Sequence, residues 1–297
     1  MQTKRPTLLI VLDGWGHAPA TDFNAITHAP AEHFLSWWQE WPHALLSASG
    51  KEVGLPLGLM GNSEVGHTNI GAGRRVYQTI TRIDEAIRSG DFERNGMLRD
   101  AVESARKSGG KLHLFGLLGD GGVHASDDHL EAMVKLALAM DLPGERIVVH
   151  LLLDGRDTPP SSGLGYLERL VPILQKEGIR IASLCGRYFG MDRDRNWERT
   201  QLFWEVMAHA NGEHQAEDAV SAIRDAYARG ETDEFVKPIV VGAPCPIEDN
   251  DSVLSLNFRA DRVRQITEIM LQGPEFDGFA RGKVPSIRYT TMTQYAK

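Results

Sequence analysis

The chain has 297 residues, enough for one large domain or two ordinary ones, and either can bury a sound hydrophobic core. Its 32 basic and 40 acidic side chains give a net charge of −8, which argues against nucleic acid and anionic membranes as partners. An acidic protein that binds an anion must use a local group of arginines. The 2 cysteines, Cys185 and Cys245, are far apart, and we expect two buried thiols in a reducing cytoplasm.

The first apolar run, Leu8–Leu12, predicts a strand that ends at Asp13 and is followed by Gly14-Trp15-Gly16. It is too short for a signal sequence or a membrane span. A carboxylate at a strand end beside glycines is a common metal ligand or nucleophile, and a plain turn residue is an equal alternative. A single strand with about two helices is too little for an independent core. We therefore expect residues 1–75 either to dock onto the rest or to belong to a domain whose remainder is absent.

The segment Gly61-Asn62-Ser63-Glu64-Val65-Gly66-His67 places a serine where a loop turns into a helix. Taken alone, such a serine is more often a helix N-cap than a nucleophile. The free N–H groups of the helix favour an anion, but a serine nucleophile also needs a base or a metal. The oxygens of Asp13 and Ser63 suit two ligands of one divalent ion, which is not yet a complete site.

After residue 75, short apolar runs alternate with helical patterns, which indicates α/β architecture with a largely parallel sheet. The predicted strands are Leu8–Leu12, Leu112–Leu118, Ile147–Leu153, Ile179–Leu184, Ile239–Val241 and Val253–Phe258. The predicted helices are Val76–Ser89, Asn95–Lys107, Asp128–Met140, Gly163–Lys176, Arg195–Ala210 and Ala216–Ala228, with Ser126 as a cap. In such sheets ligands gather at the carboxyl ends of the strands, and the polar loops of this chain fall there.

The loop that follows 112–118 reads GDGGVHA, which lacks the spacing of a dinucleotide-binding fingerprint. His124, Asp127, Asp128 and His129 could form a metal cluster, but Ser126-Asp127-Asp128 is better explained as the start of a helix. We interpret His124 as a donor that faces a ligand.

Arginines recur in the loops after the next strands. Arg156 and Asp157 lie in LLLDGRDTPP, Arg187 and Arg193 in GRYFGMDRD, and Arg259 and Arg262 in NFRADR. Such arginines form a trap for carboxylate and phosphate, for which bidentate geometry matters. The alternative is a solvated salt-bridge surface, and we accept that alternative for Arg195 alone.

Taken together and in order, DGWG, GNSEVGH, GDGGVHA, DGRDTPP, GRYFGMDRD and NFRADR resemble the cofactor-independent phosphoglycerate mutases over essentially the whole chain. The resemblance implies an alkaline-phosphatase-like metal domain interrupted by an inserted α/β phosphotransferase domain. It implies interconversion of 3-phosphoglycerate and 2-phosphoglycerate, a step of glycolysis, through a phosphoserine. The family uses two divalent ions, usually manganese.

The same resemblance implies a role for each matching residue. Ser63 is then the nucleophile and, with Asp13, a metal ligand, while Asp157 accepts and returns a proton beside the glycerate hydroxyls. The residues implied to hold phosphoglycerate are His124, Arg156, Asp157, Arg187, Arg193, Arg259 and Arg262.

The pattern departs from the family after Met292-Thr293-Gln294-Tyr295-Ala296-Lys297, about where the metal domain of the family resumes with most of its ligands. We therefore assign 1–76 to the front of the metal domain, 77–289 to the insert and 290–297 to the start of the return. We expect an inactive chain by itself, exposed apolar surface in 1–76, and a C-terminal fragment as a possible complement. A phosphoglycerate-binding fragment without catalysis and a metal-dependent phosphohydrolase remain the alternatives.

Overall fold

The computed structural model describes residues 6–19 and 22–295, and its backbone divides into two compact units, residues 1–81 and 82–297. Ala296 and Lys297, part of the predicted return segment, lie outside the described residues. The assignment of 1–76, 77–289 and 290–297 to parts of a metal domain and an insert stays a prediction. Among the described helices, none is long and apolar enough to cross a membrane.

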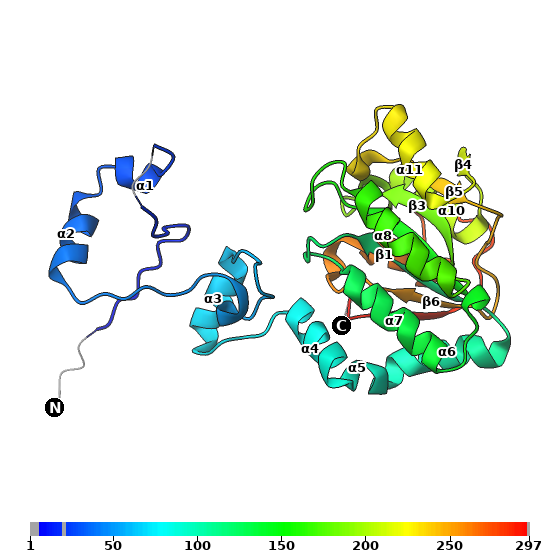
Figure 1. Ribbon diagram of the computed structural model, residues 1–297, viewed down its shortest axis with the longest axis horizontal. Coiled ribbons are helices and arrows are strands. Elements are labelled where there is room, and N and C mark those ends of the chain that lie inside the picture. The colour runs from blue at the N-terminus through cyan, green and yellow to red at the C-terminus, as the bar shows by residue number, and fades with distance from the viewer. Residues whose placement is uncertain (1–5, 20–21, 296–297) are drawn as a thin grey trace. The chain divides into compact units, whose positions relative to one another are not determined.

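The first unit holds short helices joined by loops (Figure 1). They are α1 (Ala25–His28), α2 (Glu32–Glu40), η1 (Gly50–Val53), α3 (Ser63–Ala72) and the start of α4 (Thr79–Ser89). The small core of this unit consists of Val53, Leu55 and Val65.

The predicted strand Leu8–Leu12 is wrong, because this run is irregular and pairs with no described strand. A strand needs a neighbour for its N–H and C=O groups, and the described residues of the first unit offer none. Leu8 is 81% exposed and Leu9 is 73% exposed, so this apolar run lies open as expected.

The second unit is an α/β domain around a seven-stranded sheet with the order β4-β5-β3-β2-β1-β6-β7. Its strands are β1 (Leu112–Leu118), β2 (Ile147–Leu153), β3 (Arg180–Gly186), β4 (His214–Ala216), β5 (Ile239–Val241), β6 (Ser252–Ser255) and β7 (Arg288–Thr291). All neighbours are parallel except β3 and β5. The largely parallel sheet is therefore confirmed, and β1 and β2 have the predicted bounds because both are buried apolar runs.

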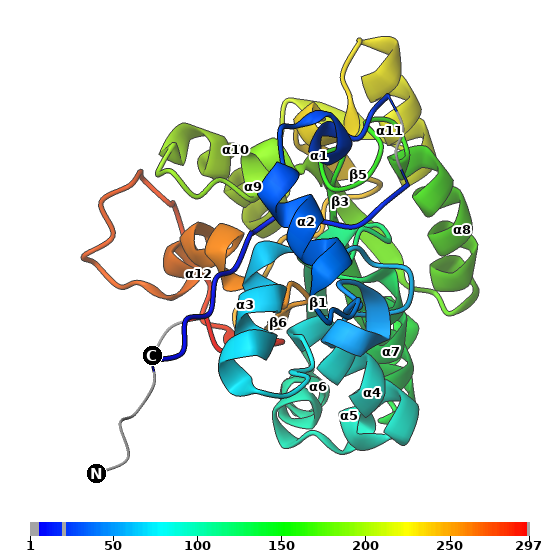
Figure 2. The same ribbon diagram turned by 90° about the vertical axis from the view of Figure 1, so that its left-hand side faces the viewer.

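Helices cover both faces of this sheet, as the two views show (Figure 1, Figure 2). The helices α6 (Gly96–Ser108), α7 (Asp127–Ala139), α8 (Gly163–Lys176) and α11 (Ala219–Ala228) pack on one core. The helices α10 (Trp197–His209) and α12 (Arg264–Leu271) pack on the other. The shorter elements are α5 (Asp91–Arg94), η2 (Gly144–Arg146), α9 (Arg187–Gly190), η3 (Asp233–Phe235) and η4 (Ala260–Arg262).

A side-chain cap explains where α6 begins, whereas α7 begins without one. The Asn95 side chain accepts hydrogen bonds from the N–H groups of Met97 and Leu98 and starts α6. Ser126 occupies the predicted cap position of α7, but its side chain makes no capping bond. The Asp127 carboxylate instead accepts the N–H of Gly119 at 2.7 Å.

A buried polar chain crosses the middle of the sheet. Asp251 Oδ2 lies 3.0 Å from His113 Nε2, His113 Nδ1 lies 2.9 Å from His150 Nε2, and His150 Nδ1 lies 2.8 Å from Ser183 Oγ. Burial lowers the pKa of both histidines, and the hydrogen bond to Asp251 offsets only part of the effect on His113. Both imidazoles are therefore neutral at pH 7 and join three neighbouring strands.

This chain of side chains predicts a loss of stability in acid. Below about pH 6.5 the unfolded chain binds protons that the folded histidines refuse, so stability is full above that pH and falls below it. We expect a loss of about 1 kcal/mol per pH unit for each histidine between pH 6.5 and 5. Urea unfolding followed by circular dichroism measures it. His150→Asn should lower the free energy of unfolding at pH 7.5 and make it depend less steeply on pH. The control His43→Asn, at an exposed position, should change neither quantity. The same pH dependence in the unaltered chain and both variants would contradict the assignment.

Candidate functional site

The carboxyl ends of β1, β2, β3 and β6 bring the predicted anion-binding residues together. His124 follows β1, Arg156 and Asp157 follow β2, and Arg187 begins α9 immediately after β3. Arg259 and Arg262 follow β6, where η4 forms. Because these strands are adjacent and parallel, their carboxyl ends meet at one edge of the sheet.

We call Arg156, Arg187, Arg193, Arg259 and Arg262 the arginine cluster. Arg187 lies at its centre, and only 3% of the Arg187 side chain is exposed. Its Nη1 donates to Asp154 Oδ1 at 2.7 Å and to Asp157 Oδ2 at 2.6 Å. Burial acts to lower the pKa of Arg187, but the two carboxylates outweigh burial and raise it. For Asp157, burial acts to raise the pKa, and the hydrogen bond and charge of Arg187 outweigh it and lower the pKa. Both groups are therefore ionised at neutral pH.

His124 is buried between charged groups. Its Nε2 lies 3.1 Å from Arg187 Nη2, and since a guanidinium only donates, Nε2 must accept. Burial and the charge of Arg187 lower the pKa of His124 to about 4, so the ring is neutral and carries its proton on Nδ1. Among the described residues Nδ1 has no hydrogen-bond partner, and Asp261 Oδ1 is 3.7 Å away. A buried N–H without an acceptor suits the predicted ligand-facing donor.

The outer arginines are about half exposed. Arg193 Nη1 lies 3.1 Å from Asp261 Oδ2, Arg259 Nε lies 3.3 Å from Asp261 Oδ1, and Arg156 Nη1 lies 3.7 Å from Glu234 Oε1.

Arg262 donates to the carbonyl of Met191 at 3.3 Å. Burial lowers the pKa of Arg262, and the positive charges of Arg187, Arg193 and Arg156 lower it further. The arginines thus repel one another, and an anion that binds among them reduces this repulsion.

Sequence reasoning missed two carboxylates of this cluster, Asp154 and Asp261. Asp154 directly follows β2 as the first acid of D-G-R-D, and its Oδ1 also accepts the N–H groups of Arg156 and Asp157. The intervening Gly155 has φ +66°, and a Cβ there would lie 2.6 Å from the nitrogen of Glu234. An acid directly after an apolar run, the sequence pattern that singled out Asp13, was the signal that could have found Asp154.

The possible metal cluster near the start of α7 separates into structural contacts. His129 Nε2 pairs with Asp84 Oδ1 at 2.8 Å, and Asp127 caps the loop at Gly119. Among the described residues, no three His, Cys, Asp or Glu side chains group as a metal site.

The first unit holds the other predicted site residues. Asn62, not Ser63, caps α3, because the Asn62 side chain accepts the N–H of Val65. The N-cap explanation of Ser63 is therefore wrong, and its hydroxyl instead donates to Asp13 Oδ2 at 2.7 Å. His67 Nδ1 lies 3.2 Å from the same hydroxyl. Two adjacent exposed oxygens suit a hard divalent cation, but they are only two ligands.

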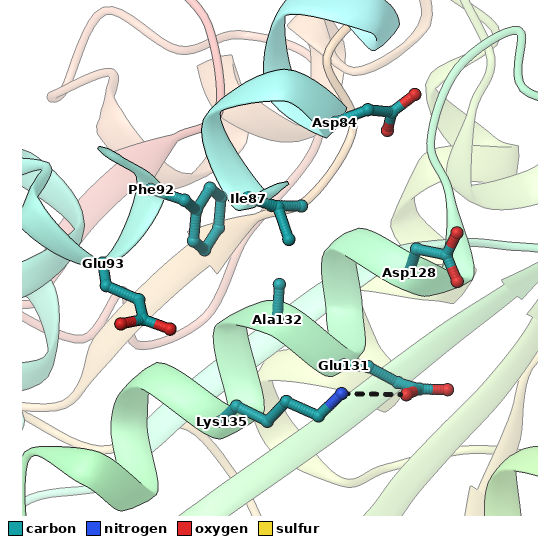
Figure 3. A pocket seen from close by; sticks show the side chains of 8 residues that line it. All are labelled: Asp84, Ile87, Phe92, Glu93, Asp128, Glu131, Ala132 and Lys135. Atoms are coloured by element: carbon teal, nitrogen blue, oxygen red, sulfur yellow. Dashed lines mark hydrogen bonds and ion pairs between the residues drawn. The ribbon is translucent and has the colours of Figure 1, made fainter. Parts of the chain in front are cut away.

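A cavity of about 300 Å³ lies between α4, α5 and α7 (Figure 3), and none of the clustered arginines lines it. It is lined by Asp84, Glu93, Asp128, Glu131, Lys135 and three apolar residues, and Lys135 already pairs with Glu131 at 3.5 Å. Its carboxylates repel a phosphate, so this cavity is no candidate for the anion site.

Comparison with known proteins gives three findings. Residues 83–297 match the family described as BPG-independent PGAM N-terminus. The chain is 46% identical over 299 residues to the 2,3-bisphosphoglycerate-independent phosphoglycerate mutase of Syntrophotalea carbinolica, covering 99% of this chain and 57% of that protein. It is 50% identical over 297 residues to that of Nitratidesulfovibrio vulgaris, covering 98% of this chain and 57% of that protein.

A crystal structure of Leishmania mexicana phosphoglycerate mutase at low cobalt concentration superposes with a TM-score of 0.79 and 34% identity. The match covers 96% of this chain and 54% of that one. The chain thus spans a little over half the length of the relatives it matches.

Asp154→Ala should destabilise the second unit by about 3 kcal/mol, because it leaves the buried Arg187 with one carboxylate instead of two. Chemical denaturation gives the value. The matched control is Asp249→Ala, which removes an exposed pair with Lys283 and should cost less than about 1 kcal/mol. Similar losses in both variants would show that Arg187 does not depend on Asp154.

Proposed function

This chain belongs to the BPG-independent phosphoglycerate mutase family, and we propose that it binds phosphoglycerate in an enzyme that interconverts 3-phosphoglycerate and 2-phosphoglycerate. The observation that carries the proposal is the set of arginines that follow adjacent parallel strands at one edge of the sheet, where Arg187, Arg193 and Arg156 lie close enough to repel Arg262. A ligand with a phosphate and a carboxylate relieves that repulsion and accepts charge-assisted hydrogen bonds from several guanidinium groups.

In the proposed site, His124 and the arginines of the cluster hold the ligand, and Asp157 handles the proton. Asp157 is ionised and fixed by Arg187, so it can accept the proton of a glycerate hydroxyl. In the first half-reaction Asp157 must be protonated when the ligand is bound, so that it gives its proton to the departing glycerate oxygen; in the second, the carboxylate takes the proton of the attacking hydroxyl. Its partly exposed carboxylate, 23% accessible, leaves room for a ligand beside it.

Ser63 is the proposed phosphoryl acceptor. The bond from phosphorus to one glycerate oxygen breaks as the bond to Ser63 Oγ forms, and the other glycerate hydroxyl later takes the phosphoryl group back. The Ser63 proton already points to Asp13, which is placed to receive it. Asp13 and Ser63 would also be two ligands of a divalent ion, proposed to be one of two manganese ions, and such an ion lowers the pKa of a bound hydroxyl.

The remaining metal ligands are proposed to come from polypeptide outside this chain, since the described residues offer no group of three. The same polypeptide would pair with the exposed run Leu8–Leu12 and cover its apolar side chains. The proposal therefore assigns phosphoglycerate binding to this chain and turnover to its complex with a complementing C-terminal segment. The two free, buried thiols, Cys185 and Cys245, suit a location in the cytoplasm.

Isothermal titration of the 297-residue chain with 3-phosphoglycerate tests binding. We expect Arg262→Ala to weaken binding about ten- to a hundredfold, because a hydrogen bond to a charged group contributes about 1.5–3 kcal/mol. Arg224→Ala removes an exposed arginine that pairs with Glu168 and should bind like the unaltered chain. Absence of binding to the unaltered chain, or equal affinity in Arg262→Ala, would count against the arginine cluster as the ligand site.

Ser63→Ala in a chain completed by a C-terminal segment of a relative should abolish mutase activity and leave phosphoglycerate affinity within about twofold, because the arginines carry the binding. Turnover is measured with manganese present, and binding by titration. Glu64→Ala at the adjacent exposed position should keep turnover. Retained turnover in Ser63→Ala would sink Ser63 as the phosphoryl acceptor.

A further inference from the structure

The arginine cluster contains two kinds of ion pair. The inner pairs join Arg187 to Asp154 and Asp157 at 2.7 and 2.6 Å, and the Arg187 and Asp154 side chains are each 3% exposed. The outer pairs join Asp261, whose side chain is 27% exposed, to Arg193 and Arg259, whose side chains are 47% and 49% exposed, so these pairs are far more open to water than the inner ones. Exposed pairs of this kind are weak and exchange readily with water, whereas buried ones do not.

Asp261 is also poorly satisfied where it lies. Its Oδ2 accepts a hydrogen bond from Arg193 Nη1 at 3.1 Å. Its Oδ1 is buried and accepts none from the described residues, although Arg259 Nε is 3.3 Å away and His124 Nδ1 is 3.7 Å away. The carboxylate thus faces three donors and takes a hydrogen bond from one of them.

From this geometry we infer that Asp261 is an internal counter-ion, which occupies the anion position of Arg193 and Arg259 and must leave them when phosphoglycerate binds. The inference rests on the proposed function for the identity of the incoming ligand. A phosphate group brings three terminal oxygens and can accept from both arginines and from the free Nδ1–H of His124. Asp261 acts only through these groups and is not itself a ligand contact.

Asp261 lies in η4, between Arg259 and Arg262 in the sequence. One short segment therefore carries two cations that bind the ligand and the anion that competes with it. The affinity for anions is therefore lower than the arginines alone would give. When product leaves, the Asp261 carboxylate can pair again with Arg193 and Arg259. Asp154 differs in this respect, because its hydrogen bonds to Arg187 and to two backbone N–H groups hold it in place.

The test is titration of the chain with 3-phosphoglycerate and with inorganic phosphate. Asp261→Asn and Asp261→Ser should both bind about three- to thirtyfold more tightly, the range that two exposed ion pairs supply. Asp261→Glu keeps the carboxylate and should stay near the original affinity. The control Asp194→Asn removes an exposed carboxylate next to Arg193 that pairs with no described arginine, and its affinity should change less than about twofold.

A second readout needs no substrate. Phenylglyoxal, which modifies accessible arginines, should label Arg193 and Arg259 faster in Asp261→Asn than in Asp194→Asn, as measured by peptide mass spectrometry. If no variant binds phosphoglycerate but this labelling rises, the proposed function fails and the counter-ion role stands. Affinity that is equal or weaker in both Asp261→Asn and Asp261→Ser, with unchanged labelling, would overturn the inference.

Discussion

The buried positive charge of Arg187 is the constraint on which the arrangement of the site loops depends. A guanidinium with 3% exposure would be very costly to hold at the end of β3 without carboxylates in contact. Asp154 and Asp157 meet this need from the end of β2, and Gly155 allows the turn that presents both. The same charge makes Nε2 of His124 an acceptor and so fixes its tautomer. The guanidinium of Arg187 therefore joins the loops that follow β1, β2 and β3.

Around this fixed centre the outer arginines are held less firmly. Burial lowers the pKa of Arg262, and the positive charges of Arg187, Arg193 and Arg156 lower it further, so each added cation raises the electrostatic cost of the next. The chain offsets part of the cost with Asp261 and Glu234, whose arginine partners are about half exposed. Under the proposed function, the buried inner pairs would keep the fold stable without ligand, and the more exposed outer pairs would let the anion position be vacated.

The sequence predicted the sheet well where strands are buried on both faces. β1 and β2 have the predicted bounds because a parallel strand under two layers of helices is an uninterrupted apolar run. The short edge strands β4 and β7 were missed, because three or four half-exposed residues leave no such signal. The arginines of the site were found from their place after strands. Their partners Asp154 and Asp261 were not, since an acid beside a glycine, as in D-G-R-D, is typical of a turn, and an acid between arginines, as in R-A-D-R, is typical of a solvated surface until the tertiary structure shows what it contacts.

Leu8–Leu12 shows the opposite failure, a strong strand pattern that forms no strand. A helix satisfies its own backbone, but a strand is stable only beside another, so its formation depends on residues far away in sequence. Asp13 and Ser63 nevertheless meet within 2.7 Å, because Asn62 takes over the helix cap and leaves the Ser63 hydroxyl free to reach the carboxylate. This contact does not require the sheet. Local capping can therefore bring two side-chain oxygens together in a unit whose predicted strand does not form.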